Sequence, residues 1–137
     1  MNTFQLKIIA SNKVFFDGEA QSLSIPRLNG GCEAYLAKHE NCVVPIEFGE
    51  MKIVDANGKK INAFVGSGFL EFLDNVATLV CISAELPEEI NERRAKEAQM
   101  RAEEELRRKH SLLEYYHSKA NLSRAMERLK VKSRYTM

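Results

Sequence analysis

The chain has 137 residues, of which 45% are hydrophobic and 28% are charged. This length suits one ordinary domain or a small domain with an appendage, and this composition excludes a largely disordered chain. No run of about 18 apolar residues occurs, which predicts that no helix crosses a membrane. The first residues lack a basic segment followed by a long apolar run, so we expect no secretion signal.

The net charge of +1 hides a difference between two halves of the chain. Residues 1–86 carry seven Lys and Arg against ten Asp and Glu, whereas residues 87–137 carry thirteen against nine. This change of composition predicts two domains, residues 1–86 and residues 87–137. Glutamates dilute the basic second half and aromatic side chains are few there, so we expect no nucleic-acid partner.

The first 86 residues have the pattern of short β-strands. In residues 3–10, Phe4, Leu6 and Ile8 alternate with polar residues, which predicts a half-buried strand. A second strand is expected over residues 13–20, with a turn at Gly18. A third is expected over residues 21–31, ended by Pro26 and two glycines.

Two hairpins are expected after these strands. Residues 51–65 contain an Asn-Gly pair at 57–58, which supplies the positive φ angles of a tight turn. Residues 69–83 repeat the pattern around Asp74-Asn75. Two further glycines, at 66 and 68, predict a bulge or a close approach of backbones. So many short strands predict a β-sandwich or barrel of about 85 residues.

After Pro87 the pattern is helical. Acidic residues gather in the first turn and basic residues at 107–110, as the helix dipole favours. A stripe of mostly small residues runs along this helix: Ala95, Ala98, Ala102 and Leu106. A second helix is expected from about Ser111 to Val131, with an apolar side of Leu113, Tyr116, Ala120, Leu122, Ala125, Met126 and Leu129. These two expected helices predict an antiparallel hairpin that turns between His110 and Lys119.

The small-residue stripe predicts a weakly held hairpin. Alanine lets helices approach closely, but its burial stabilises far less than the roughly 1.5–3 kcal/mol of a buried leucine. A weakly held element is one that a ligand or a partner can move.

No catalytic constellation is evident. The chain has no phosphate-binding loop, dinucleotide fingerprint or nucleophile elbow. Its three histidines are scattered, and Cys32, Cys42 and Cys81 lack the spacing of a zinc site. We therefore expect no catalytic residue and no metal ligand, and a binding or coupling protein instead of an enzyme.

The arginines indicate a binding site more specifically than the histidines and cysteines do. Asn91, Arg94, Ala98 and Arg101 share one face of the first helix, and Arg124 and Arg128 share one face of the second. A hairpin that brings these arginines together favours a bound anion, and guanidinium groups suit phosphate. The alternative is a solvated face with glutamate pairs, which the charge pattern alone favours.

Several segments resemble, in order and along essentially the whole chain, the epsilon subunit of bacterial F-type ATP synthase. "FVGSGFLEF" is similar to the family's Gly-Gly-Phe-hydrophobic-Glu signature, with Ser67 in place of the first glycine. "AELPEEINERRAKEAQMRAEEEL" resembles its linker and first C-terminal helix, and "SRAMERLKV" its second. The resemblance implies β + α architecture: an N-terminal flattened β-sandwich of about ten strands, then a C-terminal antiparallel two-helix hairpin.

The resemblance implies a non-catalytic part of a rotor. In that family the β domain binds the gamma subunit and the ring of c subunits. The hairpin folds against the β domain or extends along gamma into the catalytic alpha/beta hexamer, where it blocks ATP hydrolysis. No cofactor is required, but one regulatory ATP stabilises the folded form in several bacterial members. The implied place is the cytoplasmic face of the bacterial plasma membrane, peripheral and without membrane insertion.

A regulatory ATP site is implied by a motif of the form Ile-Asp-x-x-Arg-Ala, which here reads "INERRA". The matching positions are Glu85, Ile90, Asn91, Arg94, Ala95, Arg101, Arg124 and Arg128. Because spacing and resemblance single out the same arginines, the phosphate interpretation is now favoured. Asn91 stands where the family has an acidic residue, and we expect the lost charge to weaken the site by about 1 kcal/mol.

A rotor-contact loop is implied at residues 31–41. Gly31, Leu36 and His39 match the family pattern there, whereas Cys32 and Ala37 replace a glutamate and a proline. The position of the loop at the c-ring is therefore a firmer expectation than any single contact, and His39 has the alternative of capping a turn. A second function of another class also remains: a β-domain adaptor whose charged hairpin binds a partner protein.

Overall fold

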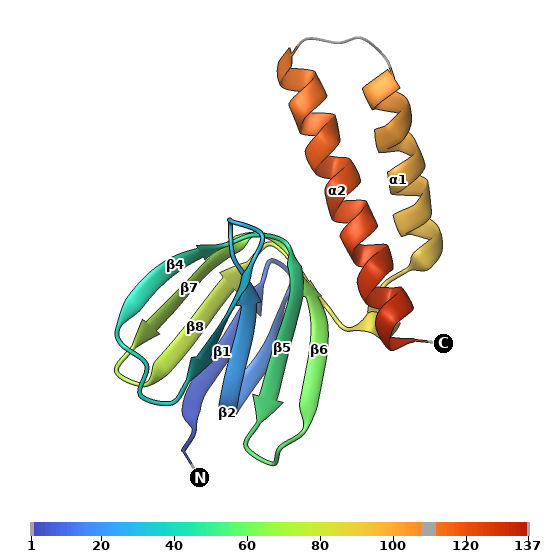
Figure 1. The fold of residues 1–137 in the computed structure, drawn as a ribbon. Helices are drawn as coiled ribbons and strands as arrows, with labels where there is room; N and C mark the ends of the chain where they lie inside the picture. The colour runs from blue at the N-terminus through green and yellow to red at the C-terminus, as the bar shows by residue number, and fades with distance from the viewer. Residues whose placement is uncertain (1, 108–111, 137) are drawn as a thin grey trace. The chain divides into compact units, whose positions relative to one another are not determined.

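The computed structural model describes residues 2–107 and 112–136. The chain divides into two compact units, Met1–Leu86 and Pro87–Met137 (Figure 1). The first unit is built of strands and the second of helices, so the architecture changes where the composition changes. None of the helices in the described ranges is both long enough and apolar enough to span a membrane.

The described part of the first unit contains nine strands in one continuous sheet, ordered β4-β7-β8-β1-β2-β5-β6-β9 with β3 beside β2. The pair β1–β8 is parallel, whereas the other neighbours are antiparallel. The strands are β1 (Phe4–Ala10), β2 (Lys13–Pro26), β3 (Cys32–Leu36), β4 (Cys42–Ile46), β5 (Gly49–Asp55), β6 (Lys60–Val65), β7 (Gly68–Leu73), β8 (Val76–Cys81) and β9 (Ala84–Glu85).

The sheet curves on itself and encloses one apolar core, which confirms the β-sandwich (Figure 1). Alternation along β1 directs Phe4, Leu6 and Ile8 into this core, where each is at most 1% exposed. The ring of Phe4 lies 5.3 Å from that of Phe72 on β7. The period-2 pattern of the sequence therefore fixes which face of each strand is buried.

The expectation of a turn at Gly18 is wrong. Strand β2 runs unbroken from Lys13 to Pro26, and Gly18 pairs with Leu6 on β1. The first half of β2 pairs with β1, and its second half pairs with β3 and β5. The ladder with β5 has a register shift between Ala20 and Ser22. One long strand thus serves both layers of the sandwich, which a lone glycine in the sequence does not reveal.

Both expected hairpins are confirmed. Gly58 has a φ of 83° in the turn between β5 and β6, and Asp74 and Asn75 have φ of 48° and 64° between β7 and β8. The close backbone approach occurs at Gly68, where a Cβ atom would meet the carbonyl oxygen of Val80 and lie 2.7 Å from the Cα of Cys81. Only glycine fits there without displacing β8.

The second unit is a pair of packed helices preceded by a short 3-10 turn. The turn spans Pro87–Glu89, α1 spans Glu92–Arg107 and α2 spans Leu112–Tyr135. At one end of the pair, the Nζ of Lys132 donates a hydrogen bond to the carbonyl oxygen of Pro87 at 3.3 Å. The expected helical hairpin is confirmed. Its turn was expected between His110 and Lys119, but α2 already begins at Leu112, so residues 112–119 are helical and the rest of that interval lies outside the described residues.

The expected stripe of α1 is buried in part: Ala95 and Ala102 are 5% and 3% exposed, whereas Ala98 and Leu106 are half-buried. On α2, Ala125 is 1% exposed. The expected apolar side of α2 needs one correction. Met126 is 51% exposed, because it follows the buried Ala125 by one residue and so points about 100° away from it. The side chains expected at 113 and 116 lie outside the described residues.

We predict that Gly68→Ala lowers the free energy of unfolding by about 3 kcal/mol, because the added methyl forces β7 away from the backbone of β8. The measurement is equilibrium unfolding in urea. Gly18→Ala is the matched control, since its nearest side-chain atoms lie 3.9 Å from an added Cβ in the middle of a strand. Equal effects of the two substitutions would contradict the prediction.

Candidate functional site

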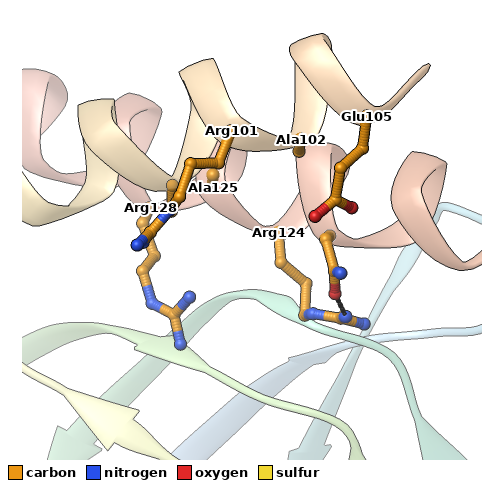
Figure 2. Close-up of a pocket in the computed structure, with 8 residues that line it drawn as sticks. Arg101, Ala102, Glu105, Arg124, Ala125 and Arg128 are labelled. Carbon is orange, nitrogen blue, oxygen red and sulfur yellow. Dashed lines mark hydrogen bonds between the residues drawn. The ribbon is translucent and has the colours of Figure 1, made fainter. Parts of the chain in front are cut away.

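Three arginines meet in a groove between α1 and α2 (Figure 2). The groove has a volume of about 280 Å3 and lies wholly within the helical unit. Each helix contributes four lining residues at spacings of three, one and three, which share one helical face. They are Ala98, Arg101, Ala102 and Glu105 from α1, and Asn121, Arg124, Ala125 and Arg128 from α2.

Polar contacts orient part of this lining. The guanidinium of Arg124 donates a hydrogen bond to the side-chain oxygen of Asn121 (Figure 2). The hydroxyl of Ser118 donates a hydrogen bond to the carboxylate of Glu105 at 2.9 Å. Within the described ranges, neither Arg101 nor Arg124 forms an ion pair. The groove therefore holds an excess of positive charge that suits the forked, charge-assisted hydrogen bonds of a phosphate group.

Asn91 acts as the N-cap of α1. Its side-chain oxygen accepts a hydrogen bond from the backbone N–H of Arg94 at 3.1 Å, and its carbonyl oxygen accepts from Ala95 N–H at 3.0 Å. Both bonds are those of an ideal N-cap, where Asn and Asp serve equally well. The replacement of the family's acidic residue thus preserves the start of the helix and removes only a charge.

The other predicted ATP residues do not line this groove. Arg94 is exposed and lies seven residues before Arg101, which places it about 10 Å away along the helix axis. Ile90 and Ala95 are buried, at 3% and 5% exposure. Glu85 belongs to β9 of the first unit. The structure therefore brings together Arg101, Arg124 and Arg128 from the predicted set.

Three polar residues at or beside the groove were not predicted from the sequence: Glu105 and Asn121, which line it, and Ser118, which donates a hydrogen bond to Glu105. A signal for the first two was present, because Glu105 follows Arg101 by four residues and Asn121 precedes Arg124 by three. Ser118 carried no such signal, since its contact depends on how the two helices are paired.

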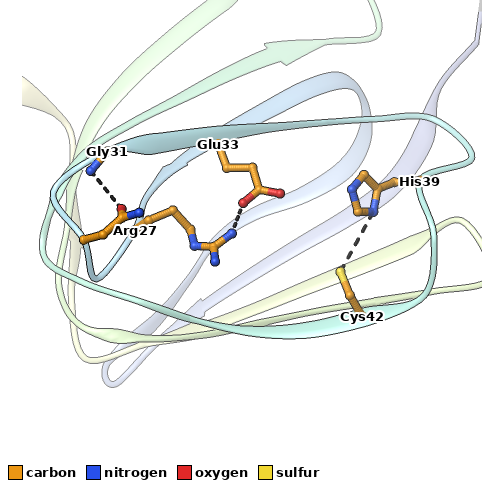
Figure 3. Close-up of polar contacts among 6 residues, drawn as sticks. Arg27, Gly31, Glu33, His39 and Cys42 are labelled. Atoms are coloured by element: carbon orange, nitrogen blue, oxygen red, sulfur yellow. Dashed lines mark hydrogen bonds and ion pairs between the residues drawn. The ribbon is translucent and has the colours of Figure 1, made fainter.

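The predicted rotor-contact loop is ordered by local bonds at its start (Figure 3). The carbonyl oxygen of Gly31 accepts a hydrogen bond from Arg27 N–H at 2.7 Å, and the Arg27 guanidinium pairs with the Glu33 carboxylate. Leu36 ends β3 with 59% of its surface exposed. Leu36 is thus available as an apolar contact, whereas Gly31 shapes the turn before it.

His39 has a structural part in the following turn, as the capping alternative expects. Its backbone N–H donates to the Leu36 carbonyl oxygen at 3.2 Å, and its ring lies 4.6 Å from the Tyr35 ring and 5.4 Å from the Phe72 ring. Its Nδ1 lies 2.8 Å from the Glu40 carbonyl oxygen, which can only accept, so this nitrogen carries a proton.

The turn that contains His39 is tied to the turn between β7 and β8. The backbone N–H of Lys38 donates to the Asn75 side chain at 2.6 Å, and the backbone N–H of Asp74 donates to the Asn41 side chain at 2.8 Å. Each turn therefore satisfies a backbone donor of the other. The two turns form one rigid end of the sandwich.

The cysteines form no metal site with the residues that the structure describes. Cys32 is exposed, and the Sγ of Cys42 lies 3.9 Å from the Nδ1 of His39 (Figure 3). Cys81 is buried, and its burial raises the pKa of the thiol to about 11. A thiol with so high a pKa is protonated at neutral pH and is a poor nucleophile.

We predict that Asn91→Ala lowers the stability of the helical unit by about 1 kcal/mol, because the N–H of Arg94 loses its partner. Asn91→Asp is the matched control: it retains the cap and adds about 0.3–1 kcal/mol through the helix dipole. Thermal unfolding followed by the helical circular dichroism signal measures both. An alanine variant as stable as the parent would show that the cap contributes nothing.

Two family models match the chain in succession. Residues 3–87 match the "ATP synthase, Delta/Epsilon chain, beta-sandwich domain". Residues 88–133 match the "ATP synthase, Delta/Epsilon chain, long alpha-helix domain". The boundary between the two matches lies next to the division between the strand-built and helix-built units.

Similar proteins carry the same description over almost their whole length. The ATP synthase epsilon chain of Ruminiclostridium cellulolyticum is 41% identical over 98% of this chain and 98% of its own. That of Caldanaerobacter subterraneus subsp. tengcongensis is 34% identical over 97% of this chain and 96% of its own.

Among solved structures, a chain of the Euglena gracilis mitochondrial ATP synthase shares the fold. It has a TM-score of 0.79 and 18% identity over 93% of this chain and 79% of that chain. With both domains matched in order and a relative 41% identical over nearly the full length, the chain belongs to the epsilon-chain family of F-type ATP synthases.

Proposed function

We propose that the chain is a non-catalytic rotor subunit in the central stalk of an F-type ATP synthase. It couples ion flow through the c-ring to rotation of the gamma subunit and to ATP synthesis, and it inhibits ATP hydrolysis when its hairpin extends. The observation that carries this proposal is the succession of both family domains along one chain. Bacterial relatives with the same description support a place at the cytoplasmic face of the plasma membrane.

The β unit is suited to transmit torque between gamma and the c-ring. Its core is continuous, and one end is stiffened by the bonds between the Asn41 and Asn75 turns. The exposed Leu36 beside this end supplies an apolar contact for the c-ring. In this proposal Gly31 and His39 act through the shape of the loop, since both are engaged in its turns.

The helical unit is suited to change its state. Its buried apolar side chains include three alanines, Ala95, Ala102 and Ala125, beside the larger Ile90 and Val131. Ser118 on α2 bonds to Glu105 on α1, and Lys132 on α2 bonds to Pro87 in the 3-10 turn. A buried methyl group contributes only about 0.8 kcal/mol. The helices can therefore separate and extend toward the alpha/beta hexamer at low cost, which is the inhibitory state of this proposal.

A regulatory ATP is the proposed ligand of the closed hairpin. Arg101 comes from α1 and Arg124 and Arg128 from α2, so a phosphate chain in the groove joins both helices. An anion bound only by the closed pair shifts the population toward it. A high ATP concentration then relieves the inhibition of ATP hydrolysis, and a low concentration promotes it.

We predict that a chain ending at residue 86 still joins the complex through gamma but no longer inhibits hydrolysis. The β unit keeps its whole core in this variant, so its contacts survive. The measurement is ATP hydrolysis by the assembled complex with the full chain or the shortened one, over a range of ATP concentrations. Equal inhibition by both forms would rule out the hairpin as the inhibitor.

The same preparation separates the proposal from a generic adaptor. A rotor subunit co-purifies with gamma in a fixed ratio whether or not the hairpin is present. An adaptor that binds its partner through the charged hairpin loses that partner in the shortened form. Quantitative gel analysis of the purified complex distinguishes the two.

We predict that calorimetry of the full chain detects ATP binding and that Arg101→Ala or Arg124→Ala weakens it by about tenfold or more, as expected for the loss of charge-assisted hydrogen bonds. Arg107→Ala is the control, because this exposed arginine of α1 does not line the groove. No heat at millimolar ATP would refute the regulatory site.

A further inference from the structure

We infer that Asn57, in the turn between β5 and β6, is a site of spontaneous deamidation and is favoured over the other Asn-Gly pair of the chain. Deamidation is a covalent modification that converts the side-chain amide of asparagine into a carboxylate. It consumes only water and needs no partner, so it is independent of the proposed function.

The reaction is an attack by the backbone on its own side chain. The backbone nitrogen of Gly58 forms a bond to the Cγ of Asn57, because the two atoms are held close to each other in the chain. The bond from Cγ to the side-chain nitrogen breaks, and ammonia leaves with the proton of the Gly58 nitrogen. Water then opens the five-membered imide at one of its two carbonyls, which gives either aspartate or isoaspartate.

The residue after Asn57 leaves the attacking nitrogen open. Gly58 is exposed and has a φ of 83°, and nothing lies within 4 Å of a Cβ atom built on it. A residue with a side chain would crowd the nitrogen, whereas glycine lets the backbone rotate at little steric cost. Asn57 is exposed as well, so water reaches the imide.

The turn is held through its backbone and through Asp55. The Asp55 carboxylate accepts the backbone N–H groups of Asn57 and Lys59, each at 2.9 Å, and the Asp55 carbonyl oxygen accepts the Gly58 N–H at 3.0 Å. The side-chain amide of Asn57 makes no hydrogen bond within the described ranges. It can therefore turn toward the Gly58 nitrogen without breaking one.

The second Asn-Gly pair, at residues 29–30, provides an internal comparison. Gly30 matches Gly58 closely: its φ is 85°, the space around an added Cβ is open, and its N–H donates to a carbonyl oxygen at 3.1 Å. The side-chain oxygen of Asn29, however, accepts the N–H of Gly31 at 3.1 Å. That bond must break before the amide turns, which should slow Asn29 by about fivefold, or about 1 kcal/mol.

The turn lies at the end of the sandwich that carries Leu36. Ser22 of β2 pairs with Leu36 of β3 on one side and with Val54 of β5 on the other, so β3 and β5 end at the same level. Aspartate adds a negative charge beside Lys59, and isoaspartate adds a methylene group to the backbone, which draws the Lys59 N–H away from Asp55. Deamidation therefore changes both the charge and the shape of this end as the protein ages.

Peptide mass spectrometry of the full chain, aged in neutral buffer, tests this inference. Exchange of NH2 for OH raises the mass of the peptide that contains residue 57, and electron-transfer fragmentation distinguishes isoaspartate from aspartate. We expect both products there, formed about fivefold faster than at Asn29. The same chain unfolded in urea is the matched control, because both pairs then lose their native hydrogen bonds and should react at similar rates.

Asn57→Gln is the matched variant. It retains a side-chain amide, but attack by the Gly58 nitrogen would now have to close a six-membered ring, which is slower. The modification at position 57 should disappear on the same time scale, and conversion at Asn29 should continue at its former rate. Urea unfolding of the fresh variant and the fresh parent verifies that the fold is kept.

Three results would overturn the inference. Conversion at Asn29 as fast as at Asn57 in the folded chain would show that the free amide confers no preference. Conversion at Asn57 in urea but not in the folded chain would show that the turn protects it. An unchanged mass increase in the Asn57→Gln variant would place the modification at another residue of the same peptide.

Discussion

Repulsion among arginines over a seam of alanine is the constraint on which the behaviour of the helical unit depends. Arg101, Arg124 and Arg128 border one small groove that Glu105 also lines, and the excess of positive charge disfavours the pairing of the helices that carry it. The buried side chains of Ala102, Ala125 and Val131 offset part of this repulsion. The closed hairpin is therefore sensitive to any anion that adds hydrogen bonds to both helices, because such an anion converts repulsion into attraction.

The fold was largely predictable because its rules are local. The alternation of Phe4 and Leu6 with polar residues marks a strand with one buried face, and the Asn-Gly pair at 57–58 marks a hairpin turn. Gly18 was misread because a glycine within a strand and a glycine in a turn look alike in the sequence. The difference is set by the pairing of β2 with strands before and after it. Met126 was misassigned because a long apolar side chain one position beyond a buried residue still fits a broad helical stripe.

The candidate site was predictable in part. Spacing along each helix identified Arg101, Arg124 and Arg128, since residues three and four apart share a face. Whether the faces of two helices oppose each other at the same level is a property of their pairing, and this determines that Arg94 lies outside the groove. Asn91 shows a second reason why the sequence predicts the site only in part. Its place directly before a helix is the signature of an N-cap, yet the same residue also fits a nucleotide motif, and sequence alone assigns no priority between the two.

The parallel pairing of β1 with β8 has a consequence for the order in which the β unit is completed. Gln5 of β1 pairs with Val76 of β8, which lies some seventy residues later in the chain. Both edges of β1 are therefore covered only after β8 has joined the sheet. Contacts this far apart in sequence form late and slow the folding of a domain. Until then β1 and β2 form a two-stranded ribbon with an open edge, the kind of surface on which chains join one another. During synthesis, the interval before β8 is made is thus the period in which this protein is most exposed to aggregation.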